Sequence, residues 1–300
     1  MDFIDKTRRW FASSSMPVRL MAVNAGVFVV LTAALLLGAG AGNALALWTV
    51  ELPSELSELL MRPWTLLTYM FAHRGVGHLL FNMLWLYWLG TIFLEYFTPK
   101  QLVGLYVLGG LGGAVLFVAA YNLLPFLAGE DKYLIGASAS VLAIVVGISA
   151  YAPNYRVNLL LWGGVSLKWI AIATIGLDFL NLGTGAAQGN IGGHLAHVGG
   201  MAVGLCFAMG MRSGHDMTAV VNKVIDAVAS LSARKRGGVG QPMGGRAYTY
   251  GENCRSVPKQ DGPTEEEIDR ILGKLKVSGF AALSDEEKNT LFGASRKRKQ

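Results

Sequence analysis

Long hydrophobic runs without charge, separated by short polar stretches, fill the chain between Leu20 and Met211. The runs are Leu20–Val50, Gly75–Leu94, Gln101–Gly129, Tyr133–Tyr155 and Phe179–Met211. Each is at least as long as the roughly 18 residues that a helix needs to cross a bilayer. The pattern therefore predicts a multi-pass membrane protein made of helices.

Six spans fit this pattern. The predicted helices are Leu20–Leu37, Gly77–Phe97, Leu102–Leu124, the part of Tyr133–Tyr155 that begins near Ser138, a helix starting near Leu167, and Gly192–Met211. Glu51–Thr68 has leucines at helical spacing among its glutamates, which predicts an amphipathic piece lying in the membrane interface. The expected fold is an all-α membrane bundle of six transmembrane helices over residues 20–212, with a small helical tail.

Charge predicts the orientation of this bundle. Basic residues are frequent in residues 1–19 and after Met211, whereas the predicted outer loops hold only Arg62, Arg74 and Lys132. Because basic loops stay on the cytoplasmic side, both termini are predicted to be cytoplasmic. The net charge of +6 follows from the same rule and does not indicate nucleic acid as a partner. A chain that is 52% hydrophobic and 15% charged has the lipid bilayer as its surroundings and is not an ordinary soluble protein.

The chain becomes polar beyond Arg212. Residues 213–262 are predicted to form an amphipathic helix, Met217–Ala233, and a Gly-rich linker. Residues 263–300 contain two capping boxes, at Thr264 and Ser284, which predict a cytoplasmic helical hairpin. Such a hairpin suits a docking module for an unidentified partner, and a loosely folded appendage without a partner is the alternative.

Two predicted helices have a face of small residues, which lets membrane helices approach closely. The face of the fourth helix comprises Gly136, Ser140, Ala143 and Gly147, and that of the sixth comprises Gly193, His197, Gly200 and Gly204. Packing of these two faces would bring His197 to the start of the helix that follows Ser138.

Strongly polar residues recur at one depth of the predicted membrane, just below its outer surface. His78 and Asn82 begin the second span, Ser138 the fourth, and His194 and His197 the sixth. Ionisable residues in spans usually face a cavity or the protein interior. A serine beside a histidine is the arrangement of a nucleophile and its general base, although single polar residues in spans more often serve packing or bend a helix.

Three motifs together resemble the rhomboid intramembrane serine proteases. They are Gly136-Ala137-Ser138, His78-Leu-Leu-Phe-Asn82 and Ala196-His197-Val-Gly-Gly200-x-x-x-Gly204. Their order on the second, fourth and sixth spans is also that of the family, and the similarity covers about Arg62 to Met211. The six-span layout is similar to that of bacterial members, which implies a location in a bacterial inner membrane.

The resemblance implies that Ser138 is the nucleophile and His197 the general base of a catalytic dyad. It implies an oxyanion hole made by His78, Asn82 and the backbone N–H of Ser138. The implied activity is that of an endopeptidase that cuts transmembrane segments of other membrane proteins, with water as co-substrate and with no cofactor or metal.

The sequence departs from the family pattern at Ala139, Leu142 and Thr65, where many relatives have a glycine, an aromatic residue that stacks on the base, and an arginine. These departures keep open a catalytically inactive rhomboid-like protein that binds membrane clients. A proton-coupled transporter is a second alternative, disfavoured because a proton relay needs polar groups through the whole membrane depth.

Three further polar residues have competing explanations. Ser140 lies on the small-residue face, which favours a packing role. His194 stands one turn before His197, but this spacing alone is a weak signal for a metal site. Asp178, the only carboxylate well inside a predicted span, would orient a histidine if the site were a triad. The dyad of the family favours instead a position at the outer end of the span or a hydrogen bond within the bundle.

Overall fold

The computed structural model describes residues 3–38, 41–124, 127, 132–159, 163–188 and 190–235, together with the single positions 271, 274 and 284. The chain divides into two compact units, Met1–Arg236 and Gly237–Gln300. Nearly all the described residues belong to the first unit. The predicted hairpin of residues 263–300, apart from those single positions, and the linker before it therefore lie outside the described residues.

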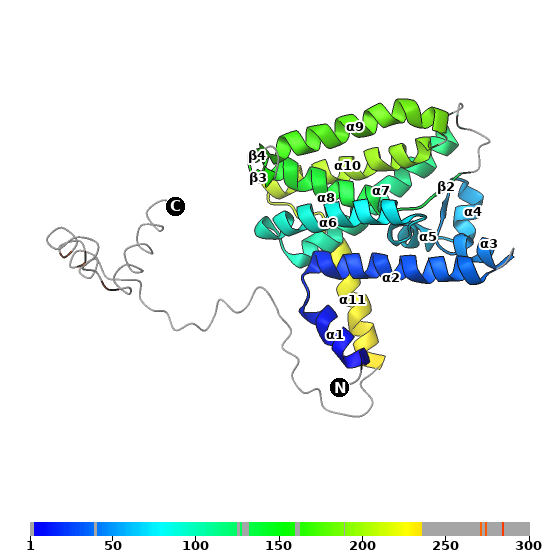
Figure 1. Ribbon diagram of the computed structural model, residues 1–300, viewed down its shortest axis with the longest axis horizontal. Helices are drawn as coiled ribbons and strands as arrows, with labels where there is room; N and C mark the ends of the chain where they lie inside the picture. The colour runs from blue at the N-terminus through cyan, green and yellow to red at the C-terminus, as the bar shows by residue number, and fades with distance from the viewer. Residues whose placement is uncertain are drawn as a thin grey trace. The chain divides into compact units, whose positions relative to one another are not determined.

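The core of the first unit is a bundle of helices, whose arrangement Figure 1 shows for the described residues. Its long helices are α2 (Met16–Leu37), α6 (Val76–Tyr96), α7 (Pro99–Leu123), α8 (Ser138–Tyr151), α9 (Leu167–Gln188) and α10 (Ile191–Arg212). Among the described helices, α2, α6, α7 and α10 are long and apolar enough to cross a membrane, and α8 is a shorter apolar helix of 14 residues. The structure thus shows a helical membrane bundle with four candidate spans.

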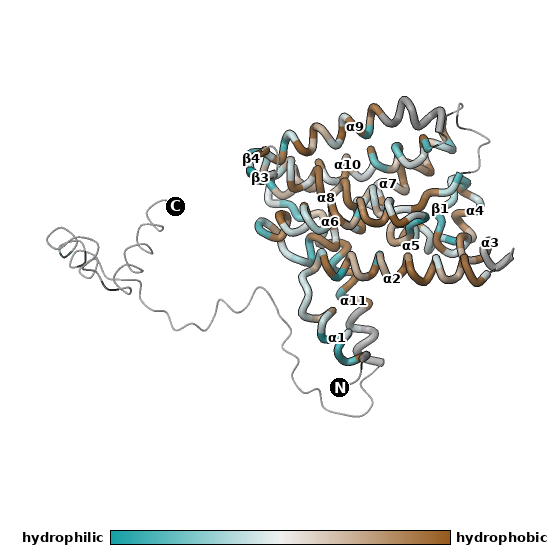
Figure 2. The backbone as a smooth tube through the Cα atoms, viewed as in Figure 1, coloured by the Kyte–Doolittle hydropathy of each residue, from teal (hydrophilic) through white to brown (hydrophobic). Residues whose placement is uncertain are grey.

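Further helices flank the bundle: α1 (Phe3–Ser13), α3 (Ala41–Trp48) and α11 (Ala219–Lys235), the last close to the predicted amphipathic helix. Figure 2 shows hydrophobic residues along α2, α8 and the described part of α9, whereas hydrophilic residues gather on α1 and near strands β3 and β4. This distribution is that of a bundle whose long helices face lipid or one another.

Helix α8 lies at the centre of the bundle, where it packs against α6, α7, α9 and α10. Its residues from Ala139 to Ser149 are almost all buried. A helix that is apolar on every side belongs in such a position, because no face of it needs water. The segment that begins with Ser138 is therefore the element around which the others are arranged.

Small residues allow α8 and α10 to touch backbone to backbone, as the sequence predicted. A Cβ atom placed on Gly200 would lie 2.1 Å from the backbone oxygen of Ala139, and one on Gly204 would lie 2.3 Å from that of Ala143. The closest approach thus involves Ala139 rather than Ser140, one position along the helix from the predicted face. The contact holds the middle of α10 against the first turn of α8.

The predicted amphipathic piece between the first two long helices is broken into several short elements. Strand β1 (Leu52–Pro53) pairs with β2 (Tyr133–Leu134), and α4 (Leu56–Met61), α5 (Thr65–Thr68) and the 3-10 turn η1 (Tyr69–Phe71) follow. Proline cannot donate a backbone hydrogen bond, and Pro63 separates α4 from α5. Some leucines of this region, such as Leu52 and Leu59, are buried, whereas Leu60 is 74% exposed. Apolar side chains therefore occur both on the face that packs against the protein and on the exposed face.

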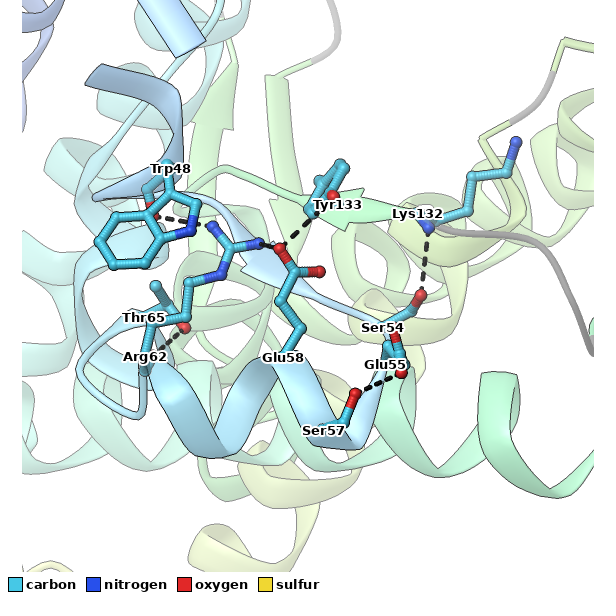
Figure 3. Close-up of polar contacts among 9 residues, drawn as sticks. All are labelled: Trp48, Ser54, Glu55, Ser57, Glu58, Arg62, Thr65, Lys132 and Tyr133. Atoms are coloured by element: carbon cyan, nitrogen blue, oxygen red, sulfur yellow. Dashed lines mark hydrogen bonds and ion pairs between the residues drawn. The ribbon is translucent and has the colours of Figure 1, made fainter. Parts of the chain in front are cut away.

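Arg62 holds this region together (Figure 3). Its side chain is buried and donates hydrogen bonds to the backbone oxygen of Trp48, at 2.7 Å, and to the carboxylate of Glu58. Its guanidinium group also stacks over the rings of Trp48 and Tyr133, 5.5 and 5.3 Å from their centroids. One side chain thus joins α3, α4 and β2, and fixes the segment that leads to Ser138.

A second pair of strands, β3 (Arg156–Leu159) and β4 (Gly163–Ser166), joins α8 to α9. The sequence did not predict this hairpin, because its apolar run shows no clear alternation. Helix α9 begins at Leu167, where the fifth helix was predicted to start.

Candidate active site

Ser138 is placed by a turn that only glycine can make. It is the first residue of α8, two positions after Gly136, whose φ angle is +139°. The backbone N–H of Gly136 donates to the carbonyl of Tyr69 at 3.0 Å. A Cβ atom on Gly136 would lie 2.7 Å from Cε1 of His78. Both the backbone conformation and the approach of the His78 ring therefore require glycine here.

The structure brings Ser138 and His197 together. Nε2 of His197, on α10, lies 2.7 Å from Oγ of Ser138. Two residues far apart in the sequence meet because Gly200 allows α10 to touch the backbone of α8. This is the distance at which a histidine accepts a hydrogen bond from a serine hydroxyl and can take its proton.

Asp178 contacts the other side of His197. Its Oδ1 atom lies 2.6 Å from Nδ1 of His197 and 2.9 Å from Nδ1 of His194. The carboxylate is on α9, which packs beside both α8 and α10. Asp178 therefore forms a hydrogen bond within the bundle, as the sequence favoured, and its contact with His197 is also compatible with an orienting role. His194, a weak metal candidate from its spacing, contacts the same carboxylate.

His78 and Asn82 stand one turn apart on α6 and line the same cavity as Ser138 and His197. The side-chain amide of Asn82 donates to the backbone oxygen of His78 at 2.9 Å. An amide group carries two N–H bonds, so one remains for another acceptor. All four residues predicted for the site are therefore gathered around one cavity.

The cavity has a volume of about 590 Å³. Its walls are mostly apolar and include Phe81 and Trp85 on α6, Val141 and Leu142 on α8, and Leu177 on α9, while α7 and α10 complete the lining. Arg74 and Asn190 add polar groups to the lining. Binding cavities typically combine such apolar walls with a few fixed polar groups.

Ser140 does not line this cavity. Its side chain is fully buried, and its Oγ would lie 2.8 Å from a Cβ atom placed on Gly110 of α7. The hydroxyl thus faces the contact between α7 and α8, as expected for a packing residue.

His73 is a residue near the site that sequence reasoning missed. Its side chain is buried, and its ring lies 5.0 Å from that of His78, edge to face. Burial, which is the larger cause, and the neighbouring His78 together lower the pKa of His73 to about 4. The one available signal was its position five residues before His78.

Asp178, His194 and His197 have ligand atoms within 4.8 Å of one another, close enough to surround a metal ion. However, the contacts at 2.6 and 2.9 Å are hydrogen bonds between a carboxylate and two imidazoles. Hydrogen bonding therefore already explains why these three groups lie together.

The fold and the cavity define a helical membrane protein with a serine–histidine–carboxylate cluster inside its bundle. A model of the rhomboid domain matches residues 61–214, and the chain therefore belongs to the rhomboid family. The match covers the helices that contribute Ser138, His197, His78, Asn82 and Asp178.

Curated relatives agree with this assignment. Over 160 residues the chain is 32% identical to RHOMBOID-like protein 12, mitochondrial, of Arabidopsis thaliana, covering 50% of this chain and 47% of that protein. It is 30% identical over 153 residues to Rhomboid-related protein 1 of Caenorhabditis elegans, covering 48% and 38%. Rhomboid-like protein 17, chloroplastic, of Arabidopsis thaliana is 28% identical over 151 residues, covering 46% and 47%.

The chain thus spans about half or less of the length of these curated relatives. Two of them are named for the mitochondrion and the chloroplast. Neither the predicted bacterial inner membrane nor the predicted orientation of the termini gains support from the similarity, and both stay predictions.

Proposed function

We propose that this rhomboid-family protein is an intramembrane serine endopeptidase that cleaves transmembrane segments of other membrane proteins. In this proposal the bundle crosses the bilayer six times. The observation that carries the proposal is the 2.7 Å contact between Oγ of Ser138 and Nε2 of His197, at the wall of a largely apolar cavity.

The chemistry follows from the positions of these groups. His197 takes the proton of Ser138 as Oγ attacks the carbonyl carbon of the substrate, and then gives that proton to the leaving amine. Water next attacks the acyl-enzyme and loses a proton to His197, which returns it to Ser138. The products are a new carboxyl end and a new amino end.

The tetrahedral intermediate needs hydrogen-bond donors for its negative oxygen. The backbone N–H of Ser138 has no acceptor in a preceding helical turn, because Ser138 begins α8. This N–H and the side chains of His78 and Asn82 are the donors of the proposed oxyanion hole. Each such donor in a site that excludes bulk water contributes a factor of about 100 or more to the rate.

The lining of the cavity supports an apolar peptide as substrate. Phe81, Trp85 and Leu142 offer contacts to hydrophobic side chains, and Arg74 and Asn190 offer polar groups from which water can reach the acyl-enzyme. A peptide bond within a helix is shielded by its own turns, so a transmembrane substrate must unwind locally before Ser138 reaches it.

A fluorophosphonate probe tests the proposal, because it reacts only with an activated serine. The purified, detergent-solubilised protein should be labelled, and Ser138→Ala and His197→Ala should each abolish labelling. Ser140→Ala is the matched control and should leave labelling intact. A folded wild-type protein that is neither labelled nor able to cut a membrane substrate would overturn the proposal in favour of an inactive, client-binding rhomboid-like protein.

A further inference from the structure

We infer that Asp178 is a positioning residue for the Ser138–His197 pair, held in place by His194, so that Ser138, His197 and Asp178 form a hydrogen-bonded relay. This inference rests on the proposed protease function. It concerns a carboxylate on α9, a helix that contributes none of the residues predicted for the site.

The hydrogen bonds form one continuous line. Oγ of Ser138 lies 2.7 Å from Nε2 of His197, and Nδ1 of the same ring lies 2.6 Å from Oδ1 of Asp178. A neutral imidazole carries one proton on its two nitrogens. Since an ionised carboxylate only accepts, the proton lies on Nδ1, and Nε2 is left as the acceptor for the serine hydroxyl. The carboxylate thus selects the tautomer that a general base needs.

The same carboxylate stabilises the reacting state. When His197 takes the proton of Ser138 it becomes a cation, and the nearest negative group is Asp178. The side chains of His197 and Asp178 are only 19% and 11% exposed, so water screens this attraction weakly. An interaction that grows as the charge forms lowers the barrier more than it tightens substrate binding.

His194 fixes the carboxylate. It stands one turn before His197 on α10 and donates from Nδ1 to the same Oδ1 atom at 2.9 Å. The two imidazole rings lie edge to face, with centroids 5.6 Å apart. A second donor on one oxygen prevents the Asp178 side chain from rotating away from His197. His194 therefore acts through Asp178 and does not itself need to touch substrate.

Burying a carboxylate in a membrane helix for packing alone would cost desolvation free energy without a compensating gain. An ionisable group in a membrane helix needs a partner to offset its desolvation. A link between α9 and α10 through His194 alone would meet that need without involving His197. The contact of Asp178 with His197 is shorter, which favours the relay.

Steady-state kinetics on a synthetic single-span transmembrane peptide with a fluorophore–quencher pair test the inference. Asp178→Asn should lower kcat by roughly a hundred- to ten-thousand-fold and change KM less than about threefold, because it removes the charge and the tautomer preference. Asp178→Glu keeps the carboxylate, so its kcat should be at least about tenfold higher than that of Asp178→Asn. His194→Gln should lower kcat by roughly tenfold.

Asp226→Asn on α11 is the matched control, because this exposed aspartate pairs with the exposed Lys100 and does not line the cavity. The kcat of this variant should equal that of the wild type. A wild-type protein that is active while Asp178→Asn keeps kcat within threefold would overturn the relay but leave the protease function intact. If Asp178→Asn lowers both kcat and the thermal midpoint, and Asp178→Glu restores neither, Asp178 has a purely structural role. Loss of wild-type activity in EDTA, restored by zinc, would assign the three side chains to a metal instead.

Discussion

Ser138 offers two groups to the proposed site, its hydroxyl and its backbone N–H. As the first residue of α8 it presents its hydroxyl to His197, and its backbone N–H lies at the positive end of the helix dipole. Gly136, two residues earlier, gives His78 the room to approach. One turn of backbone thus places the Ser138 hydroxyl and leaves room for the His78 ring.

At the residue scale, replacing His78 or Asn82 by alanine should affect the transition state more than binding. In the proposed mechanism, each change removes a donor that the substrate needs only when its carbonyl oxygen becomes negative. We expect kcat to fall by roughly ten- to a thousand-fold with little change in KM, measured on the same transmembrane peptide. Phe81→Ala, on the same face of the cavity, should instead raise KM. The reverse pattern would make His78 and Asn82 binding residues.

The buried His73 should make the stability of the protein depend on pH. Its pKa is about 4 when folded and about 6.5 in an unfolded chain, so the unfolded state binds the extra proton below pH 6.5. Its contribution is fully present above pH 6.5 and is lost as the pH falls toward 4, by on the order of 2 to 3 kcal/mol. His73→Phe should flatten the fall of the thermal midpoint between pH 7 and pH 4.5. Thermal unfolding of the wild type and of this variant across that pH range checks the prediction.

Residues of the site differ in how far the sequence could predict them. Ser138, His197, His78 and Asn82 stand in motifs with fixed spacing, and the structure places all four at one cavity. Their catalytic roles stay predictions. Asp178 lies in no motif, and its partners come from another helix, so neither periodicity nor spacing could show that it meets His197.

At the element scale, the contact between α8 and α10 governs the geometry of the site. Hydrophobic run length was sufficient to predict both helices, and the spacing of small residues predicted that they touch. The strand pairs β1–β2 and β3–β4 were missed, because two to four residues per strand carry too little pattern to distinguish them from loops.

Gly200→Ala should separate Ser138 from His197. Its Cβ would lie 2.1 Å from the backbone oxygen of Ala139, which cannot move without shifting α8. We expect a lower thermal midpoint and a loss of fluorophosphonate labelling of at least about tenfold. Gly26→Ala in α2 is the matched control, because no atom lies within 4 Å of the added carbon and alanine favours a helix. Equal behaviour of the two variants would contradict a steric role for Gly200.

At the scale of the whole molecule, the amphipathic α11 belongs to the same compact unit as the long helices that it flanks. Thr218, just before α11, is fully buried, and a Cβ atom on Gly104 of α7 would lie 2.6 Å from its Cβ. Asp216 accepts a hydrogen bond from Gln101 at 3.0 Å, and Asp226 pairs with Lys100. The sequence predicts a boundary at Arg212, because the composition changes there, and this boundary stays a prediction. The first compact unit extends to Arg236 and includes α11.

A chain ending at Arg236 should therefore keep its thermal midpoint and its labelling by the probe, because the first compact unit is complete. A chain ending at Arg212 should unfold at a lower temperature, since it exposes the surface of α7 that Thr218 covers. Thermal unfolding and labelling of both truncations in detergent provide the comparison. Loss of labelling in the longer truncation, with unchanged unfolding, would show that residues 237–300 control the site.

Because Ser138, Asp178 and His197 come from three successive helices, the proposed site cannot exist on a partly synthesised chain. A ribosome that has delivered α8 into the membrane has made the nucleophile but neither its base nor the carboxylate. Only the arrival of α10 completes the set. The order of the helices along the chain would thus protect neighbouring membrane proteins from premature cleavage during biosynthesis, without a removable inhibitory segment.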